Sequence, residues 1–206
     1  MAISLFLHPT SNSLTVISGF ESGHTSITQL ISSTWKTLYV AQPHLQPILS
    51  ISISPRSSKE LFYLTSSADS IIAKHSIPST SSNIIGPLLP LKTLQTKHAG
   101  QQSLQIRNDG KVFATAGWDS KVRVYGVKGM KELAVLKWHK EGCYSVAFAD
   151  VILAEEEAGG VEGNEIVGVE KSGALSVMEE RQRKAVLTHW LAVGSKDGKV
   201  SLWEIY

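Results

Sequence analysis

One short pattern occurs four times in the chain, and this repeat constrains the fold more than any other feature. Each copy has small residues, an acid, a Ser or Gly, and then alternating apolar residues; the copies span 17–24, 65–72, 115–122 and 193–200. The turn acids are Glu21, Asp69, Asp119 and Asp197, separated by 48, 50 and 78 residues. Repeats of roughly 40 to 50 residues with four strands each are typical of propeller blades. The sequence therefore predicts an all-β segment of a propeller with about four blades.

Strands of alternating character, bounded by turn residues, divide the chain into blades at about 1–41, 42–95, 96–137 and 138–206. The third blade is the most regular. Its hairpins are expected to turn at 108–110 and 119–120, where Asn-Asp-Gly and Asp-Ser tolerate the positive φ of a tight turn.

The last blade differs from the other three. An acidic, glycine-rich insertion occupies about 150–188, and the Ser/Pro/Asn-rich stretch 78–90 in the second blade is expected to be a surface loop. No sequence remains after Tyr206 for a fourth strand. We therefore expect the last blade to lack its outer strand and the chain to be a C-terminal or shortened form of a longer propeller.

Composition excludes several classes of protein. With 42% hydrophobic residues, 18% charged residues and a net charge of +2, the chain is an ordinary soluble globular protein. Its single cysteine, Cys143, rules out an intrachain disulfide and a cysteine-based zinc cluster, and is expected to pack as a small apolar residue. The sequence has neither a signal peptide nor an apolar run of membrane-spanning length, so no membrane association is expected.

Charge is unevenly placed along the chain. Residues 92–140 carry ten Lys/Arg and three acids, whereas 141–180 carry ten acids and one Lys. This asymmetry is either incidental or marks a basic rim that faces a partner. Alternation places Lys121, Arg123 and Tyr125 on one strand face, so the basic stretch 121–140 is either a phosphate-binding stripe or a solvated outer strand and turn. The near-neutral total charge favours the second interpretation, and direct nucleic-acid binding is not expected.

No motif for catalysis or for metal binding is present. Asp69, Asp119 and Asp197 hold equivalent places in different blades, which indicates a structural role in turns rather than acid–base chemistry. The seven histidines are dispersed without ligand spacing, and no glycine loop that could hold a phosphate is present. We therefore expect no enzyme activity, no cofactor, no metal and no small-molecule substrate.

The residues around these turns resemble the WD repeat. In that family a His, a Ser or Thr, the turn Asp and an aromatic residue six positions after it form a hydrogen-bonded set within each blade. The matching residues are His44, Thr65 and Asp69 in the second blade, His98, Thr115, Asp119 and Tyr125 in the third, and His139, Asp197 and Trp203 in the fourth. His75 takes the aromatic place in the second blade, and Val193 replaces the hydroxyl residue in the fourth.

The segments 115–125, 134–140 and 191–203 more particularly resemble the ASTRA-associated protein 1 family, fungal WD-repeat proteins similar to animal G-protein beta-like WD proteins. The resemblance implies a nuclear, non-catalytic interaction scaffold in the ASTRA complex, which is involved in chromatin remodelling. The implied partners are PI3K-like kinase cochaperones and AAA ATPases. Two alternatives remain: a propeller that contacts nucleic acid through 121–140, and a cytoplasmic adaptor similar to a signalling beta subunit.

Overall fold

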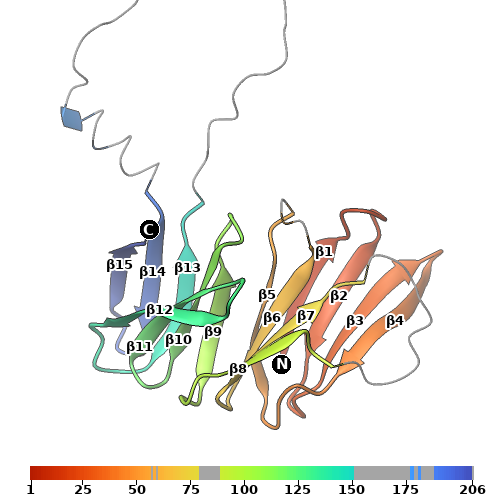
Figure 1. Ribbon diagram of the computed structural model, residues 1–206, viewed down its shortest axis with the longest axis horizontal. Helices are drawn as coiled ribbons and strands as arrows, with labels where there is room; N and C mark the ends of the chain where they lie inside the picture. The colour runs from red at the N-terminus through yellow and green to blue at the C-terminus, as the bar shows by residue number, and fades with distance from the viewer. Residues whose placement is uncertain are drawn as a thin grey trace, which may run out of the picture.

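The computed structural model describes residues 1–56, 58, 60–78, 89–150, 177, 178, 181 and 188–205. Within these residues the strands form four antiparallel sheets, each built from strands that are consecutive in the chain. The predicted fold class, an all-β propeller segment whose last blade is incomplete, is confirmed. The sheets form an open array in which the first and the fourth lie at opposite ends (Figure 1).

The first sheet contains β1 (Ala2–Leu7), β2 (Leu14–Gly19), β3 (Thr25–Ile31) and β4 (Thr34–Ala41). The second contains β5 (Ile48–Ile53), β6 (Phe62–Ser67), β7 (Ile71–Ser76) and β8 (Lys92–Gln95). The third contains β9 (Gln101–Ile106), β10 (Val112–Gly117), β11 (Lys121–Gly126) and β12 (Lys131–Lys137). The fourth contains β13 (Cys143–Phe148), β14 (Trp190–Ser195) and β15 (Val200–Glu204).

The core lies between successive sheets, because successive residues of a strand point to opposite faces. Tyr63 of β6 packs with Ile17 and Ile27 of the first sheet, whereas its neighbour Leu64 packs with Leu104 of the third. A further cluster joins the third sheet to the fourth. Both faces of an inner sheet are therefore buried, and every residue of β6 and β10 is buried.

The first strands of the sheets lie side by side and are linked by side chains. Ser52 of β5 accepts a hydrogen bond from the backbone N–H of Ile106 in β9 (3.0 Å), and Gln105 of β9 accepts one from the N–H of Phe148 in β13 (2.7 Å). Because the strands alternate in direction, the loops after even-numbered strands all lie at one edge of the array, the lower edge in Figure 1. The loops after odd-numbered strands lie at the upper edge.

Two predictions concern segments for which little structure is described. Most of the predicted surface loop 78–90 and most of the insertion 150–188 lie outside the described residues, so both stay predictions. Within the described residues, no helix has the length and apolar character that crossing a lipid bilayer requires.

Candidate interaction surface

In the second sheet the WD-type residues are joined by hydrogen bonds. His44 contacts both carboxylate oxygens of Asp69 through Nδ1 (3.2 Å each) and the hydroxyl of Thr65 through Nε2 (2.9 Å). Thr65 also contacts Nε2 of His75 (3.3 Å), whose Nδ1 contacts the hydroxyl of Tyr39 in the first sheet (2.7 Å). One direction satisfies every group: Tyr39 donates to His75, His75 to Thr65, Thr65 to His44, and His44 to Asp69.

This chain of hydrogen bonds requires both histidines to be neutral, since each ring uses one nitrogen as a donor and the other as an acceptor. Burial, together with the nearby His44, lowers the pKa of His75 to about 3. Burial raises the pKa of Asp69, but the hydrogen bonds from His44 and from the N–H of Ile71 outweigh it and hold the pKa below its usual value. The charged Asp69 thus anchors the network at the lower edge.

The third sheet uses a different partner for its turn acid. His98 is partly exposed, and its Nδ1 lies 3.8 Å from Asp119, beyond hydrogen-bond distance. Arg123 instead donates to both carboxylate oxygens of Asp119, at 3.1 and 2.6 Å. The hydroxyls of Thr115 and Tyr125 interact only weakly with each other. Neither makes a well-formed hydrogen bond with any residue that the structure describes.

The fourth sheet has a third arrangement. Nε2 of His139 contacts the hydroxyl of Ser201 (2.8 Å), which also accepts a hydrogen bond from the indole N–H of Trp203 (2.9 Å). Asp197 lies in the turn between β14 and β15, where it accepts a hydrogen bond from the N–H of Lys199 (3.2 Å) and pairs with its ammonium group (3.0 Å). His139 and Trp203 are thus brought together by Ser201 rather than by Asp197.

One position explains the difference between the three sheets. The residue four places after the turn acid lies directly across from the hydroxyl position: Ala73 opposite Thr65, Arg123 opposite Thr115, and Ser201 opposite Val193. The small Ala73 leaves room for His44 to reach the turn acid. Arg123 instead binds the turn acid itself, and Ser201 binds the histidine of its sheet, His139. Arg123 and Ser201 were not among the residues predicted for the hydrogen-bonded sets, although their spacing from the acid was a visible signal.

The strand face that carries Lys121, Arg123 and Tyr125 is largely buried. Arg123 and Tyr125 are each only 1% exposed, since sheets pack on both faces of β11. Tyr125 stacks on Phe113 with ring centroids 5.0 Å apart, so it offers no face to a nucleic-acid base. Both interpretations of this face, the phosphate-binding stripe and the favoured solvated outer strand, are therefore wrong for Arg123 and Tyr125.

The hydrogen-bonded turns support a lower edge that carries exposed apolar side chains. Trp118 is 45% exposed, its indole N–H donates to Gln102 (2.8 Å), and its ring lies against Gly100, which has a φ of +73°. Trp138 is 55% exposed and packs edge-on against His139. Leu45, in the loop between β4 and β5, is also exposed. We call Leu45, Trp118 and Trp138 the lower-edge apolar residues.

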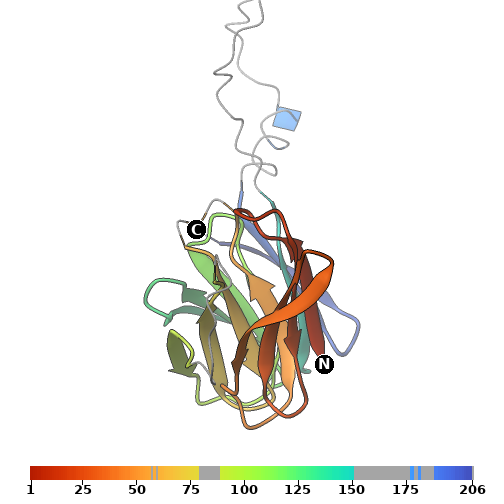
Figure 2. The same ribbon diagram turned by 90° about the vertical axis from the view of Figure 1, so that its right-hand side faces the viewer.

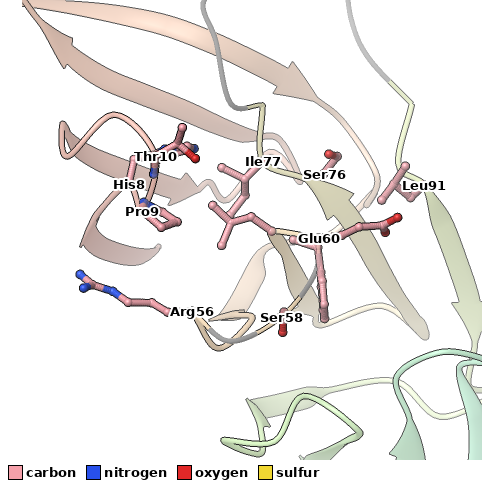
Figure 3. Close-up of a pocket in the computed structure, with 11 residues that line it drawn as sticks. His8, Pro9, Thr10, Arg56, Ser58, Glu60, Ser76, Ile77 and Leu91 are labelled. Atoms are coloured by element: carbon pink, nitrogen blue, oxygen red, sulfur yellow. Dashed lines mark hydrogen bonds between the residues drawn. The ribbon is translucent and has the colours of Figure 1, made fainter. Parts of the chain in front are cut away.

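The upper edge contains a pocket of about 600 Å³ between the first and second sheets (Figure 3). Leu61, Phe62 and Ile77 supply its apolar surface, while Arg56 and Glu60 extend away from each other on its rim. His8 also lines the pocket, but its Nδ1 accepts the backbone N–H groups of residues 10 and 11, at 3.3 and 3.4 Å. The pocket thus combines an apolar interior with a mixed-charge rim.

Cys143 and the turn acids serve the structure. The thiol of Cys143 is buried in the cluster between the third and fourth sheets, as predicted, and burial raises its pKa to about 11. Asp69 and Asp119 are engaged by His44 and Arg123. No group of three or more His, Cys, Asp or Glu that could hold a metal ion occurs among the residues with described positions.

Comparison with known proteins supports the WD-repeat assignment. Residues 89–126, which include β8 to β11, match the family model "WD domain, G-beta repeat". Three fungal proteins, each named ASTRA-associated protein 1, are similar to the chain. The identity is 50% over 208 residues for Verticillium alfalfae, 46% over 236 for Aspergillus niger and 31% over 199 for Schizosaccharomyces pombe.

These alignments cover 100%, 100% and 91% of this chain, but 50%, 53% and 43% of the respective relatives. The chain therefore spans about half the length of the curated relatives that it matches. Its resemblance to the ASTRA-associated protein 1 family, which the residues of the third and fourth blades indicated, is confirmed over the whole chain.

Proposed function

We propose that this chain, a WD-repeat segment similar to the ASTRA-associated protein 1 family, is a non-catalytic protein-interaction scaffold of the ASTRA complex. The observation that carries the proposal is the similarity of the entire chain, at up to 50% identity, to proteins with that name. The partners that we propose are PI3K-like kinase cochaperones and AAA ATPases, and the place of action is the nucleus, in chromatin remodelling.

The lower edge has the properties of a surface that binds proteins. Large aromatic residues near the centre of an interface contribute much of its binding energy. Trp118 and Trp138 are held in place by Gln102, Gly100 and His139, so little conformational freedom is lost when they are covered. We therefore propose the lower-edge apolar residues as the contact surface for a subunit of the complex.

The chemistry of the conspicuous polar groups also supports a scaffold. The turn acids form hydrogen bonds or ion pairs with neighbouring residues, and the one thiol is buried with a raised pKa. These groups stabilise the sheets and their connections, and rigid connections are what a binding platform requires.

Affinity purification tests the proposal directly. The chain would be expressed with a tag in its native fungal cells, and the proteins that co-purify at moderate salt identified by mass spectrometry. We expect PI3K-like kinase cochaperones and AAA ATPases in stoichiometric amounts, and their absence from a folded, nuclear chain would contradict the proposal. Asp119→Ala, which is expected to destabilise the third sheet, is the control. Proteins that are recovered with this variant but not with the wild type bind only the unfolded chain.

A further inference from the structure

Two lysines face each other on neighbouring strands at the lower edge of the third sheet. Lys121 begins β11 and Lys137 ends β12, and the two are direct cross-strand partners. Side chains in such positions share one face of the sheet, and like charges there destabilise the pairing. Lys121 lies 3.9 Å from Asp119, but Arg123 already donates two hydrogen bonds to that carboxylate. Lys137 is exposed and forms no ion pair with any residue that the structure describes.

A similar lysine pair in the second sheet is compensated within the chain. Lys74 of β7 and Lys92 of β8 are also cross-strand partners. The ammonium group of Lys74 lies 4.1 Å from the centre of the Phe62 ring, and that of Lys92 donates a hydrogen bond to the carbonyl of Gly129 at 3.0 Å. The pair in the third sheet, by contrast, has one carboxylate nearby, and an arginine occupies it.

Further lysines extend the positive charge along the same edge. Lys97 and Lys140 lie in the connections after β8 and β12, and Lys196 lies in the turn between β14 and β15. All three are exposed, and none forms an ion pair with a described residue. This edge is also at the bottom of Figure 2, which looks along the array with the first sheet nearest the viewer. We call Lys97, Lys121, Lys137, Lys140 and Lys196 the lower-edge lysines.

The two exposed tryptophans lie among these lysines. Trp138 directly follows Lys137, and Trp118 lies three residues before Lys121. A Cβ added at Gly142 would lie 3.2 Å from the carbonyl oxygen of Trp118, so the loop that carries Trp138 passes beside the turn that carries Trp118. The surface therefore combines aromatic side chains with ammonium groups that lack a carboxylate of their own.

The lower edge of the first two sheets has the opposite balance of charge. Its connections, at 20–24, 42–47 and 68–70, contain Glu21 and Asp69 but neither lysine nor arginine. The charge of the lower edge therefore changes sign along the array. A negatively charged segment is attracted to the half that carries the tryptophans and is repelled from the other half.

From this surface we infer that the segment bound at the lower edge is an acidic peptide of a partner protein, with apolar side chains between its carboxylates. The inference rests on the proposed function, because it takes the lower edge as the contact surface. The apolar side chains of the peptide pack on Trp118 and Trp138, and its carboxylates pair with the lower-edge lysines. The exposed Glu141 would repel a continuous phosphate backbone, whereas a peptide can place a neutral or basic residue beside it.

Binding also removes an unfavourable interaction that the free chain contains. A carboxylate placed between Lys121 and Lys137 converts their repulsion into two attractions. The gain arises only when the surface is occupied, so the lysine pair favours the bound state over the free one.

Fluorescence anisotropy with a synthetic probe tests this inference. The probe is a short labelled peptide in which Glu alternates with Leu and Phe, and a peptide with Gln in place of each Glu is its control. We expect the purified chain to bind the acidic peptide at least about tenfold more tightly at low salt, and the difference to shrink as salt screens the charges. The assay contains no other subunit, so its failure is distinguishable from a failure to recover ASTRA subunits from cells.

Lys137→Glu separates binding from folding. It places a carboxylate opposite Lys121, so an attractive pair replaces a repulsive one and the midpoint of thermal unfolding should rise. The same substitution should weaken binding of the acidic peptide by about tenfold, leave binding of the Gln peptide unchanged, and be rescued by Lys137→Arg. A merely structural role of Lys137 would not give a more stable chain that binds less tightly.

Lys131→Glu is the matched control, because Lys131 is exposed on the same strand but at its other end, away from the lower edge. An acidic peptide that binds no more tightly than the Gln peptide would overturn the inference, as would equal weakening by Lys137→Glu and Lys131→Glu. Tighter binding of single-stranded oligothymidylate than of the acidic peptide would also overturn it and would assign the surface to nucleic acid.

Discussion

Arg123 donates two hydrogen bonds to Asp119, at 3.1 and 2.6 Å, and it occupies the position from which Ala73 lets His44 reach Asp69 in the neighbouring sheet. A single residue four places after the turn acid therefore decides whether the acid is bound by a histidine or by an arginine. The arginine is almost completely buried; Asp119 binds its guanidinium at 2.6 Å, and the more exposed Glu132 lies 3.7 Å from its Nε.

Removing the acid should therefore cost more stability in the third sheet than in the second. Asp119→Ala removes the closer of the two carboxylates paired with a buried guanidinium and leaves it with Glu132 at 3.7 Å. The loss of a buried partner typically costs about 3–5 kcal/mol of unfolding free energy. Asp69→Ala leaves a neutral histidine without an acceptor, which costs about 1–3 kcal/mol. Urea denaturation of both variants at pH 7 measures the difference, and equal losses would show that Arg123 finds other compensation.

Truncating the arginine should convert the third sheet to the arrangement of the second. Arg123→Ala removes the group that holds Asp119, and His98, now 3.8 Å away, should move to a hydrogen-bond distance of about 3 Å. This new bond offsets part of the lost ion pair, so Arg123→Ala should be less destabilising than Asp119→Ala. A crystal structure of the variant provides the check. A His98 that stays in place would mean that its loop, rather than Arg123, sets its position.

Stability should fall as the pH drops below about 6.5 because of His75. The pKa of His75 is lowered from 6.5 to about 3 in the folded chain, so between these values the unfolded chain binds more protons and acidification favours unfolding. One such group contributes about 1.4 kcal/mol per pH unit, or about 2 kcal/mol between pH 6.5 and 5. His75→Phe should reduce the dependence of the urea midpoint on pH in this window. An unchanged dependence would assign it to other groups.

Gly100 should be required for the placement of Trp118. Its φ of +73° is strained for other residues, and an added Cβ would lie 2.1 Å from Cε3 of the indole ring. Gly198 has a φ of +77° but nothing within 4 Å, so Gly198→Ala carries the backbone strain, about 1 kcal/mol, without the clash. Gly100→Ala should lower the midpoint of thermal unfolding further than Gly198→Ala. Equal shifts would indicate that Trp118 moves aside freely.

The sequence was sufficient for the fold because the repeat, the alternation and the turn residues all indicated the same structure. The turns predicted around 108–110 and 119–120 have positive φ at Gly110 and Ser120, as expected. Period-2 alternation did not distinguish exposed from buried faces in the third sheet, because inner sheets bury both. For that reason Tyr125 and Arg123 were misplaced on the surface.

The hydrogen-bonded sets were harder to predict, since they depend on competition between neighbouring side chains rather than on spacing alone. The positions of His98 and Asp119 match those of His44 and Asp69, yet Arg123 changes the outcome. In the fourth sheet the hydroxyl group lies at Ser201 rather than at residue 193, and it draws His139 away from the turn acid. The three arrangements can be told apart in the sequence by the residue four places after each turn acid, which is Ala73, Arg123 or Ser201.

The central claim is that the lower edge of this chain binds a subunit of the ASTRA complex, and quantitative affinity purification of matched variants tests it most directly. Trp118→Ala and Trp138→Ala would be compared with Leu133→Ala, in which a side chain of similar exposure is truncated away from the lower edge. Thermal unfolding would establish that all three variants are folded. The account predicts that recovery of PI3K-like kinase cochaperones and AAA ATPases falls at least about tenfold for the tryptophan variants, the effect of losing about 1.4 kcal/mol of binding free energy, and is unchanged for Leu133→Ala. Equal recovery with all three variants would contradict it.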